Sequence, residues 1–151
     1  MTARSIVYDT STNFLNVHEW AYGLTEVAHI LSLAVGVGLI AVVDLRLLGV
    51  GVQRVSAERL WRATAAISLM GLVVAVTSGL MIFSTDPVRY FDHPTMRFKL
   101  LLVLVALAFN YTLHSRVVRG NHPPIVGSSV AVLSLLMWVA VVFSGIFYAF
   151  T

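Results

Sequence analysis

The chain has 151 residues, of which 58% are hydrophobic and only 11% are charged, and its mean hydropathy is +0.88. A soluble domain is usually about one quarter charged, so this composition excludes a soluble enzyme and a disordered chain. The absence of cysteine excludes disulfides, thiolate zinc sites, iron–sulfur clusters and cysteine nucleophiles. In so apolar a chain, we interpret the net charge of +3 as an indication of which side of a membrane the basic residues face. No nucleic-acid partner is expected.

Long apolar stretches organise the chain. A membrane-spanning helix needs about 20 mostly apolar residues, and such stretches lie at about 24–48, 60–83, 95–115 and 124–150. The connections between them are too short to hold a soluble domain. We therefore predict an all-α, integral membrane four-helix bundle with up-down-up-down topology over residues 20–151, preceded by an N-terminal tail over residues 1–19. The tail lacks the pattern of a signal peptide, so the first span is expected to be retained.

The basic residues divide unequally between the two ends of this bundle. Six lie at one end, namely Arg46, Arg54, Arg59, Arg62, Arg116 and Arg119. Four lie at the other, namely Arg4, Arg89, Arg97 and Lys99. Because Lys and Arg favour the cytoplasmic side, we predict a multi-pass protein of the bacterial cytoplasmic (inner) membrane with both termini in the periplasm.

Polar side chains inside the spans form two stripes. Ionisable groups there are costly and usually face the bundle interior. At about 100° per residue, one face of the first span carries Glu26, His29 and Asp44, and one face of the third carries Lys99, Asn110 and His114. The interval from His29 to Asp44 equals that from Lys99 to His114, roughly 22 Å of helix. This spacing predicts two polar layers separated by an apolar slab, an outer one with Glu26, His29 and Lys99 and an inner one with Asp44, Asn110 and His114.

The inner layer has a simple chemical interpretation. The Asp44 carboxylate can accept a hydrogen bond from the His114 imidazole and fix its tautomer. Arg46, Arg62 and Arg116 lie at a similar depth and are expected to be close enough to join an ion-pair network. The alternative is that Asp44 and His114 only anchor the ends of their helices at the membrane interface.

The outer layer suggests a haem site. An interior histidine of a helical bundle can supply an axial ligand, while polar groups hold the propionates. His29 is the best first ligand, and the candidates for the second are His93 and Met81. Lys99 and Tyr90 could hold propionates. The alternative for His29 is a hydrogen-bonded core histidine without a cofactor.

A metal site is a further alternative for the same layer. Glu26 and His29 lie one helical turn apart on one face, the pair of ligand types that carboxylate-bridged di-iron bundles use. Those bundles need a second copy of the pair and additional glutamates, and this sequence has no second copy.

Several motifs between Trp20 and His114 resemble an uncharacterised family of small bacterial four-span membrane proteins, a domain of unknown function. The motifs are Glu26–His29, Val42–Gly49, Thr77–Leu80 followed by Arg89-Tyr90, His93-Pro94, Phe98–Leu100 and Asn110–His114. That family usually has Asn where this chain has His93. The resemblance implies four spans, and the general pattern is loosely similar to b-type cytochromes and copper-resistance membrane bundles.

These observations lead to a functional hypothesis. We expect a small, non-catalytic b-type haem subunit that passes electrons between a periplasmic donor and a membrane acceptor. The alternative is a cofactor-free accessory or assembly subunit of a larger membrane complex. In either case the expected partners are the lipid bilayer and other membrane subunits or further copies of the same chain.

Overall fold

The computed structural model describes residues 9–51 and 53–150, and the described part is helical without a β-strand. Its long helices are α2 (Glu19–Leu47), α3 (Ala57–Phe83), α5 (Pro94–Phe109) and α7 (Pro124–Phe150). The third span continues from α5 through a π-helical segment, η2 (Asn110–His114), into α6 (Ser115–Arg119). Four helices, counting 94–119 as one, are long and apolar enough to cross a membrane. The predicted all-helical fold with four apolar helices is thus confirmed.

Short elements fill the N-terminal end and the connection between α3 and α5. A 3-10 turn, η1 (Thr10–Thr12), and α1 (Phe14–Val17) precede α2, and α4 (Pro87–Asp92) follows α3. The side chain of Asn13 donates to the Ser84 carbonyl at 2.9 Å. The described part of the predicted tail is therefore folded against the end of α3.

Local sequence signals explain where the helices begin. The Ser56 hydroxyl accepts a hydrogen bond from the Arg59 amide and caps α3, and Asp86 caps α4 in the same way. Such side chains satisfy backbone amides that have no partner within the helix. Proline occupies the first position of α4, α5 and α7, where its missing N–H costs nothing.

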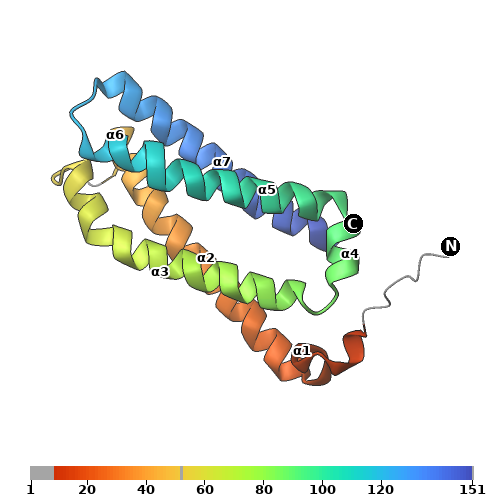
Figure 1. Ribbon diagram of the computed structural model, residues 1–151. Helices are drawn as coiled ribbons and strands as arrows, with labels where there is room; N and C mark the ends of the chain where they lie inside the picture. Colours follow the sequence, from red (N-terminus) through yellow and green to blue (C-terminus); the bar gives the residue numbers. More distant parts are fainter. Residues whose placement is uncertain (1–8, 52, 151) are drawn as a thin grey trace.

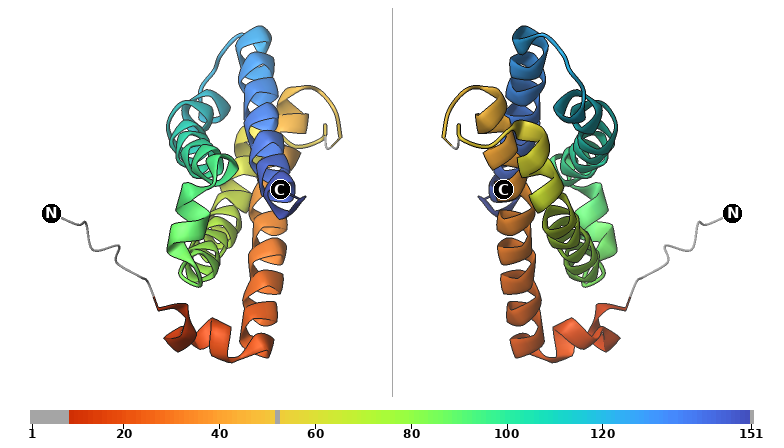
Figure 2. Two further views of the ribbon diagram at one scale, coloured as in Figure 1. Left: turned by 90° about the vertical axis from the view of Figure 1, so that its right-hand side faces the viewer. Right: turned by 90° about the vertical axis from the view of Figure 1, so that its left-hand side faces the viewer.

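The long helices pack side by side in the spatial order α3, α2, α7 and α5. Figures 1 and 2 show α2 between α3 and α7, and α7 between α2 and α5, in agreement with the main helix contacts. The connections α2–α3 and α6–α7 lie at one end of the molecule, and α4 lies at the other (Figure 1). Helix α3 contacts the third span at α6. Several helices therefore enclose the polar groups at the end that carries the α2–α3 and α6–α7 connections.

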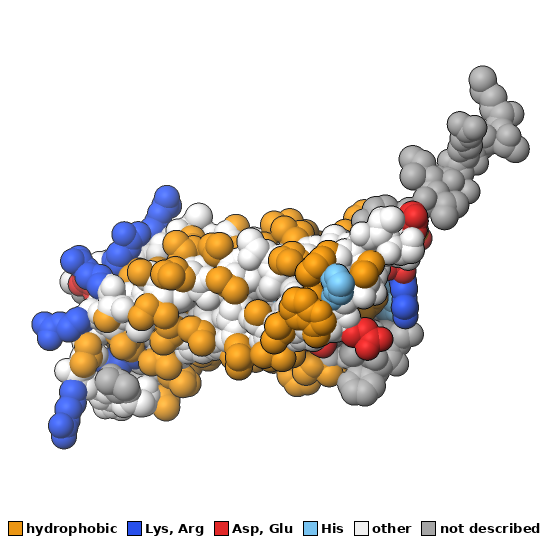
Figure 3. All heavy atoms as spheres, turned by 90° about the horizontal axis from the view of Figure 1, so that it is seen from below, with side chains coloured by type: hydrophobic (Ala, Val, Ile, Leu, Met, Phe, Trp, Pro, Cys, Tyr) orange, Lys and Arg blue, Asp and Glu red, His pale blue; other side chains and the backbone are white. Residues whose placement is uncertain are grey.

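The surface is apolar along the helices and charged at the ends. Exposed large hydrophobic residues include Val27, Leu31, Met70, Leu104 and Leu136. Figure 3 shows this apolar band with the Lys and Arg side chains gathered mainly at one end and acidic ones mainly at the other. The basic end carries the arginines of the α2–α3 connection, the first turns of α3, and α6. We call it the basic end, and the end that carries α4 the acidic end. An apolar band of this kind suits a lipid environment.

The closest helix contact joins α2 and α3 through glycine. A Cβ atom at Gly71 would lie 2.9 Å from the backbone of Gly36 and of Ser32. The Ser68 hydroxyl donates to the Gly36 carbonyl at 2.9 Å across the same contact. Small residues allow such approach in lipid, where dispersion and interhelical hydrogen bonds hold helices together.

We expect Gly71→Ala to destabilise the protein by about 1–3 kcal/mol, because the added methyl group meets backbone atoms that cannot move aside. Unfolding in mixed detergent micelles would measure this. Gly38→Ala in α2 is the matched control, since a Cβ there meets nothing within 4 Å. Equal effects of the two substitutions would contradict the described contact.

Candidate functional site

The inner polar layer is centred on a fully buried hydrogen bond. The Nε2 atom of His114 lies 2.5 Å from Oδ1 of Asp44, and both side chains are 0% exposed. Asp44 belongs to the last turn of α2, and His114 ends η2. This hydrogen bond therefore joins the first and third spans. Asp44 and His114 lie at one depth, as their spacing in the sequence predicts.

The π-helical geometry of η2 contributes to this arrangement. A π-helical turn is rare, and such turns occur frequently at functional sites. In η2, both Asn110 and His114 are buried. They are four positions apart and lie on one helix face, so the segment contributes two polar side chains to the interior, one at each of its ends.

Aromatic packing encloses the buried pair. The ring of Trp61, from the second turn of α3, lies 5.5 Å from the His114 ring between centroids, and Phe109 lies 6.5 Å from it. Trp61 also packs against Tyr111. The first three spans therefore meet around His114.

Several buried polar atoms of α2, η2 and α7 have no hydrogen-bond partner among the described residues. They include Asp44 Oδ2, His114 Nδ1, both amide atoms of Asn110 and the Ser134 hydroxyl of α7. An unsatisfied buried group costs about 1–3 kcal/mol. Internal water in a site polar and large enough to hold it satisfies such groups in many proteins, so this cluster is suited to hold small polar ligands such as water.

The arginines expected to join this layer bond elsewhere. Arg46 donates to the Val55 carbonyl at 2.7 Å, and Arg62 pairs with Glu58 at 2.7 Å on the surface. Arg116 is exposed. The expected ion-pair network is therefore wrong, because Arg46 and Arg62 have partners in the loop and at the surface, and Arg116 is exposed, so that no cation has to be buried.

The outer layer holds His29 against the backbone of α3. Its Nδ1 lies 2.7 Å from the Ala75 carbonyl and 3.3 Å from the Ser78 hydroxyl. A carbonyl oxygen can only accept, so Nδ1 carries a hydrogen, and in the neutral imidazole Nε2 keeps a lone pair. A Cβ atom at Gly79 would lie 2.9 Å from the ring carbon Cε1, so the missing side chain makes room for the imidazole.

The charged members of the outer layer lie nearer the surface than predicted: Glu26 is exposed on α2, and Lys99 is half-buried. Lys99 and Glu26 both interact electrostatically with His29. The Lys99 amine extends toward α7, 3.0 Å from where a Cβ of Gly145 would lie. No group of three or more His, Asp or Glu residues within the described chain is placed to hold a metal ion. Glu26 and His29 thus have no third protein ligand of these types for a metal.

The remaining residues predicted for the haem site, His93, Tyr90 and Met81, do not lie in one place. His93 precedes α5, and its ring packs edge-on against Tyr148 with centroids 5.0 Å apart. The Tyr90 ring lies 5.3 Å from the same tyrosine, and its hydroxyl lies near that of Tyr22. Met81 is 49% exposed on α3. The structure brings His93 and Tyr90 together at the acidic end and leaves Met81 largely at the surface.

The described residues form a small helical protein with four helices of membrane-spanning length, a buried polar cluster around Asp44 and His114, and a partly buried one around His29. It belongs to DUF6644, a family of unknown function whose pattern matches residues 11–151. No curated protein and no solved structure matches the chain. Membership of an uncharacterised family is therefore confirmed.

Removal of one partner from the buried pair should be costly. We expect Asp44→Ala to destabilise the protein by about 3–5 kcal/mol, because His114 loses its only hydrogen-bond partner among the described residues. Unfolding in mixed micelles would measure the change. Glu58→Ala, which breaks the exposed pair with Arg62, should cost at most about 1 kcal/mol. A loss at Asp44 no larger than that at Glu58 would contradict this assignment.

Proposed function

We propose that this chain is a small b-type haem subunit of the bacterial cytoplasmic membrane, which passes electrons between a periplasmic donor and a membrane acceptor. The observation that supports it best is the His29 imidazole. Its Nδ1–H is held by the Ala75 carbonyl at 2.7 Å, which leaves Nε2 as an available ligand atom. Metal-bound histidines commonly donate their other N–H to a carbonyl in this manner.

The surroundings of His29 fit a haem in charge as well. Lys99 is half-buried and interacts electrostatically with His29, so a propionate near it would give the amine a counter-charge. The Tyr90 hydroxyl is a second group at the same end that can bond a propionate. His93 is the better candidate for the second axial ligand, because Met81 is largely exposed.

When bound, haem would supply a one-electron centre, and the chain's own residues would determine its setting. The Ala75 carbonyl and the Ser78 hydroxyl orient the imidazole. Gly79 allows that imidazole to approach α3. The aromatic rings of Tyr90 and Tyr148 would give the acidic end an apolar wall beside the haem.

The proposal includes a membrane arrangement. We place the four long helices across the bilayer in alternating directions, with the basic end in the cytoplasm and the acidic end in the periplasm. The arginines of the α2–α3 connection and α6 support this orientation by the preference of Lys and Arg for the cytoplasmic side. The acidic end, close to His29, would then face a periplasmic donor.

A cofactor-free accessory or assembly subunit is the second candidate. It is favoured by a shallow apolar groove on the outer face of α7, lined by Ser128, Ser129, Val132, Leu133 and Leu136. Small hydroxyl residues beside branched apolar ones are suited to a neighbouring helix in lipid, which would come from another subunit or a further copy of the chain.

We expect the purified native protein to contain haem and His29→Gln to lose most of it, since glutamine retains a polar side chain of similar size but is not a usual haem ligand. Extraction of haem as its pyridine complex would measure the content. His122→Gln is the control, because His122 is exposed at the basic end. Equal haem content in both variants would remove His29 from the site.

Cysteine labelling tests the orientation in a chain that has no native cysteine. With the outer membrane permeabilised, we expect Asp92→Cys to react with an impermeant maleimide in intact cells. Gln53→Cys should react only after lysis, because that connection lies at the basic end. The opposite pattern would contradict the orientation, and reaction of both in intact cells would contradict the membrane crossing.

A further inference from the structure

The charge of Asp44 requires a counter-charge that the arginines do not supply. Arg46 and Arg62 bond to Val55 and Glu58 instead, and the only hydrogen-bond partner of Asp44 among the described side chains is His114. An uncompensated carboxylate in an apolar interior is strongly disfavoured. The compensating positive charge must therefore come from the pair itself or from a ligand bound to it.

A proton count identifies that ligand. With one hydrogen, shared between His114 Nε2 and Asp44 Oδ1, the pair would carry a net negative charge. A second hydrogen on His114 Nδ1 makes the pair neutral, whichever partner holds the first. We propose that Asp44 and His114 form a buried proton-binding site, hydrated from the basic end, in which His114 Nδ1 carries the additional proton. This inference does not rest on the haem proposal.

The neighbouring groups are consistent with a neutral pair. From η2, the pair faces the amide of Asn110, which is buried and unpartnered, and Tyr111, whose hydroxyl lies near that of Ser68. From α3 it faces the uncharged ring of Trp61. On α7, the hydroxyl of Ser134 is buried without a partner. No second charged side chain among the described residues is buried with the pair, so a proton is the simplest compensation.

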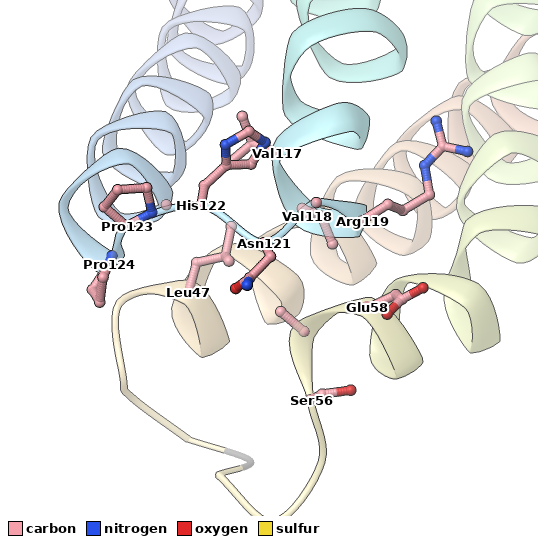
Figure 4. A pocket seen from close by; sticks show the side chains of 13 residues that line it. Leu47, Ser56, Glu58, Val117, Val118, Arg119, Asn121, His122, Pro123 and Pro124 are labelled. Atoms are coloured by element: carbon pink, nitrogen blue, oxygen red, sulfur yellow. The ribbon is translucent and has the colours of Figure 1, made fainter.

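A cavity approaches the pair from the basic end. It measures about 370 Å³ and opens at the basic end, between the end of α2, the start of α3, α6 and the start of α7 (Figure 4). Val118, one of its walls, packs with Val43 and Trp61, the residues beside Asp44 and against His114. Val118 is about 6 Å along the helix axis from His114. One apolar layer therefore separates the cavity from the pair.

Nitrogen NMR of the full chain, labelled with ¹⁵N-histidine in lipid nanodiscs at neutral pH, tests the proposal. The signals of His114 are those that disappear in His114→Gln. We expect a protonated Nδ1 in the native protein, with a cross-signal to water in water-edited spectra. In Asp44→Asn, which removes the need for a counter-charge, we expect the imidazole to hold a single proton.

A bare Nδ1 in the native protein would overturn the proposal, because the pair would then be negatively charged. Exchange of choline chloride for sodium chloride distinguishes a metal cation. If sodium removes the Nδ1 proton or shifts the His114 signals, the site binds sodium and not a proton. An imidazole with two protons in Asp44→Asn would also overturn it, since no carboxylate would then require the charge.

Discussion

The buried hydrogen bond between Asp44 and His114 is the interaction on which the arrangement at the basic end depends. A carboxylate cannot remain unpaired in an apolar interior, so α2 and the third span are held at one relative depth by a bond of 2.5 Å. Trp61 of α3 covers the same imidazole, and α3 meets the third span at α6. The first three spans therefore contact one another around this pair.

Two polar layers with different chemistry result from this arrangement. The core cluster of Ile40, Leu72, Ala106, Trp138 and Val141 belongs to the apolar slab between them. In the proposed function, the outer layer uses the lone pair of His29 to bind an electron carrier; in the separate proposal for the inner layer, Asp44 and His114 hold a proton. The glycine contact of Gly36 with Gly71 supports the outer layer, because it brings α2 close enough for His29 to reach the α3 backbone.

The sequence predicts the parts of this structure that depend on local pattern. Long apolar stretches predict the four helices, and equal spacing along two helices places Asp44 and His114 at one depth, because the helical rise per residue is constant. The π-helical segment and the position of the Arg46 side chain depend on the backbone path, which no periodicity encodes. The contact of His29 with Gly79 likewise depends on how two helices pack. For this reason the prediction of an ion-pair network of arginines is wrong, whereas the common depth of Asp44 and His114 is predictable from the sequence.

The proposed function depends on ligation of a haem by Nε2 of His29. Electron paramagnetic resonance of the oxidised, purified native protein, produced with ample haem, tests this most directly. We expect a low-spin ferric signal typical of two axial ligands. His93→Ala should convert it to a high-spin signal, and Met81→Leu should retain it. A colourless native protein without any ferric haem signal would contradict the proposed haem site.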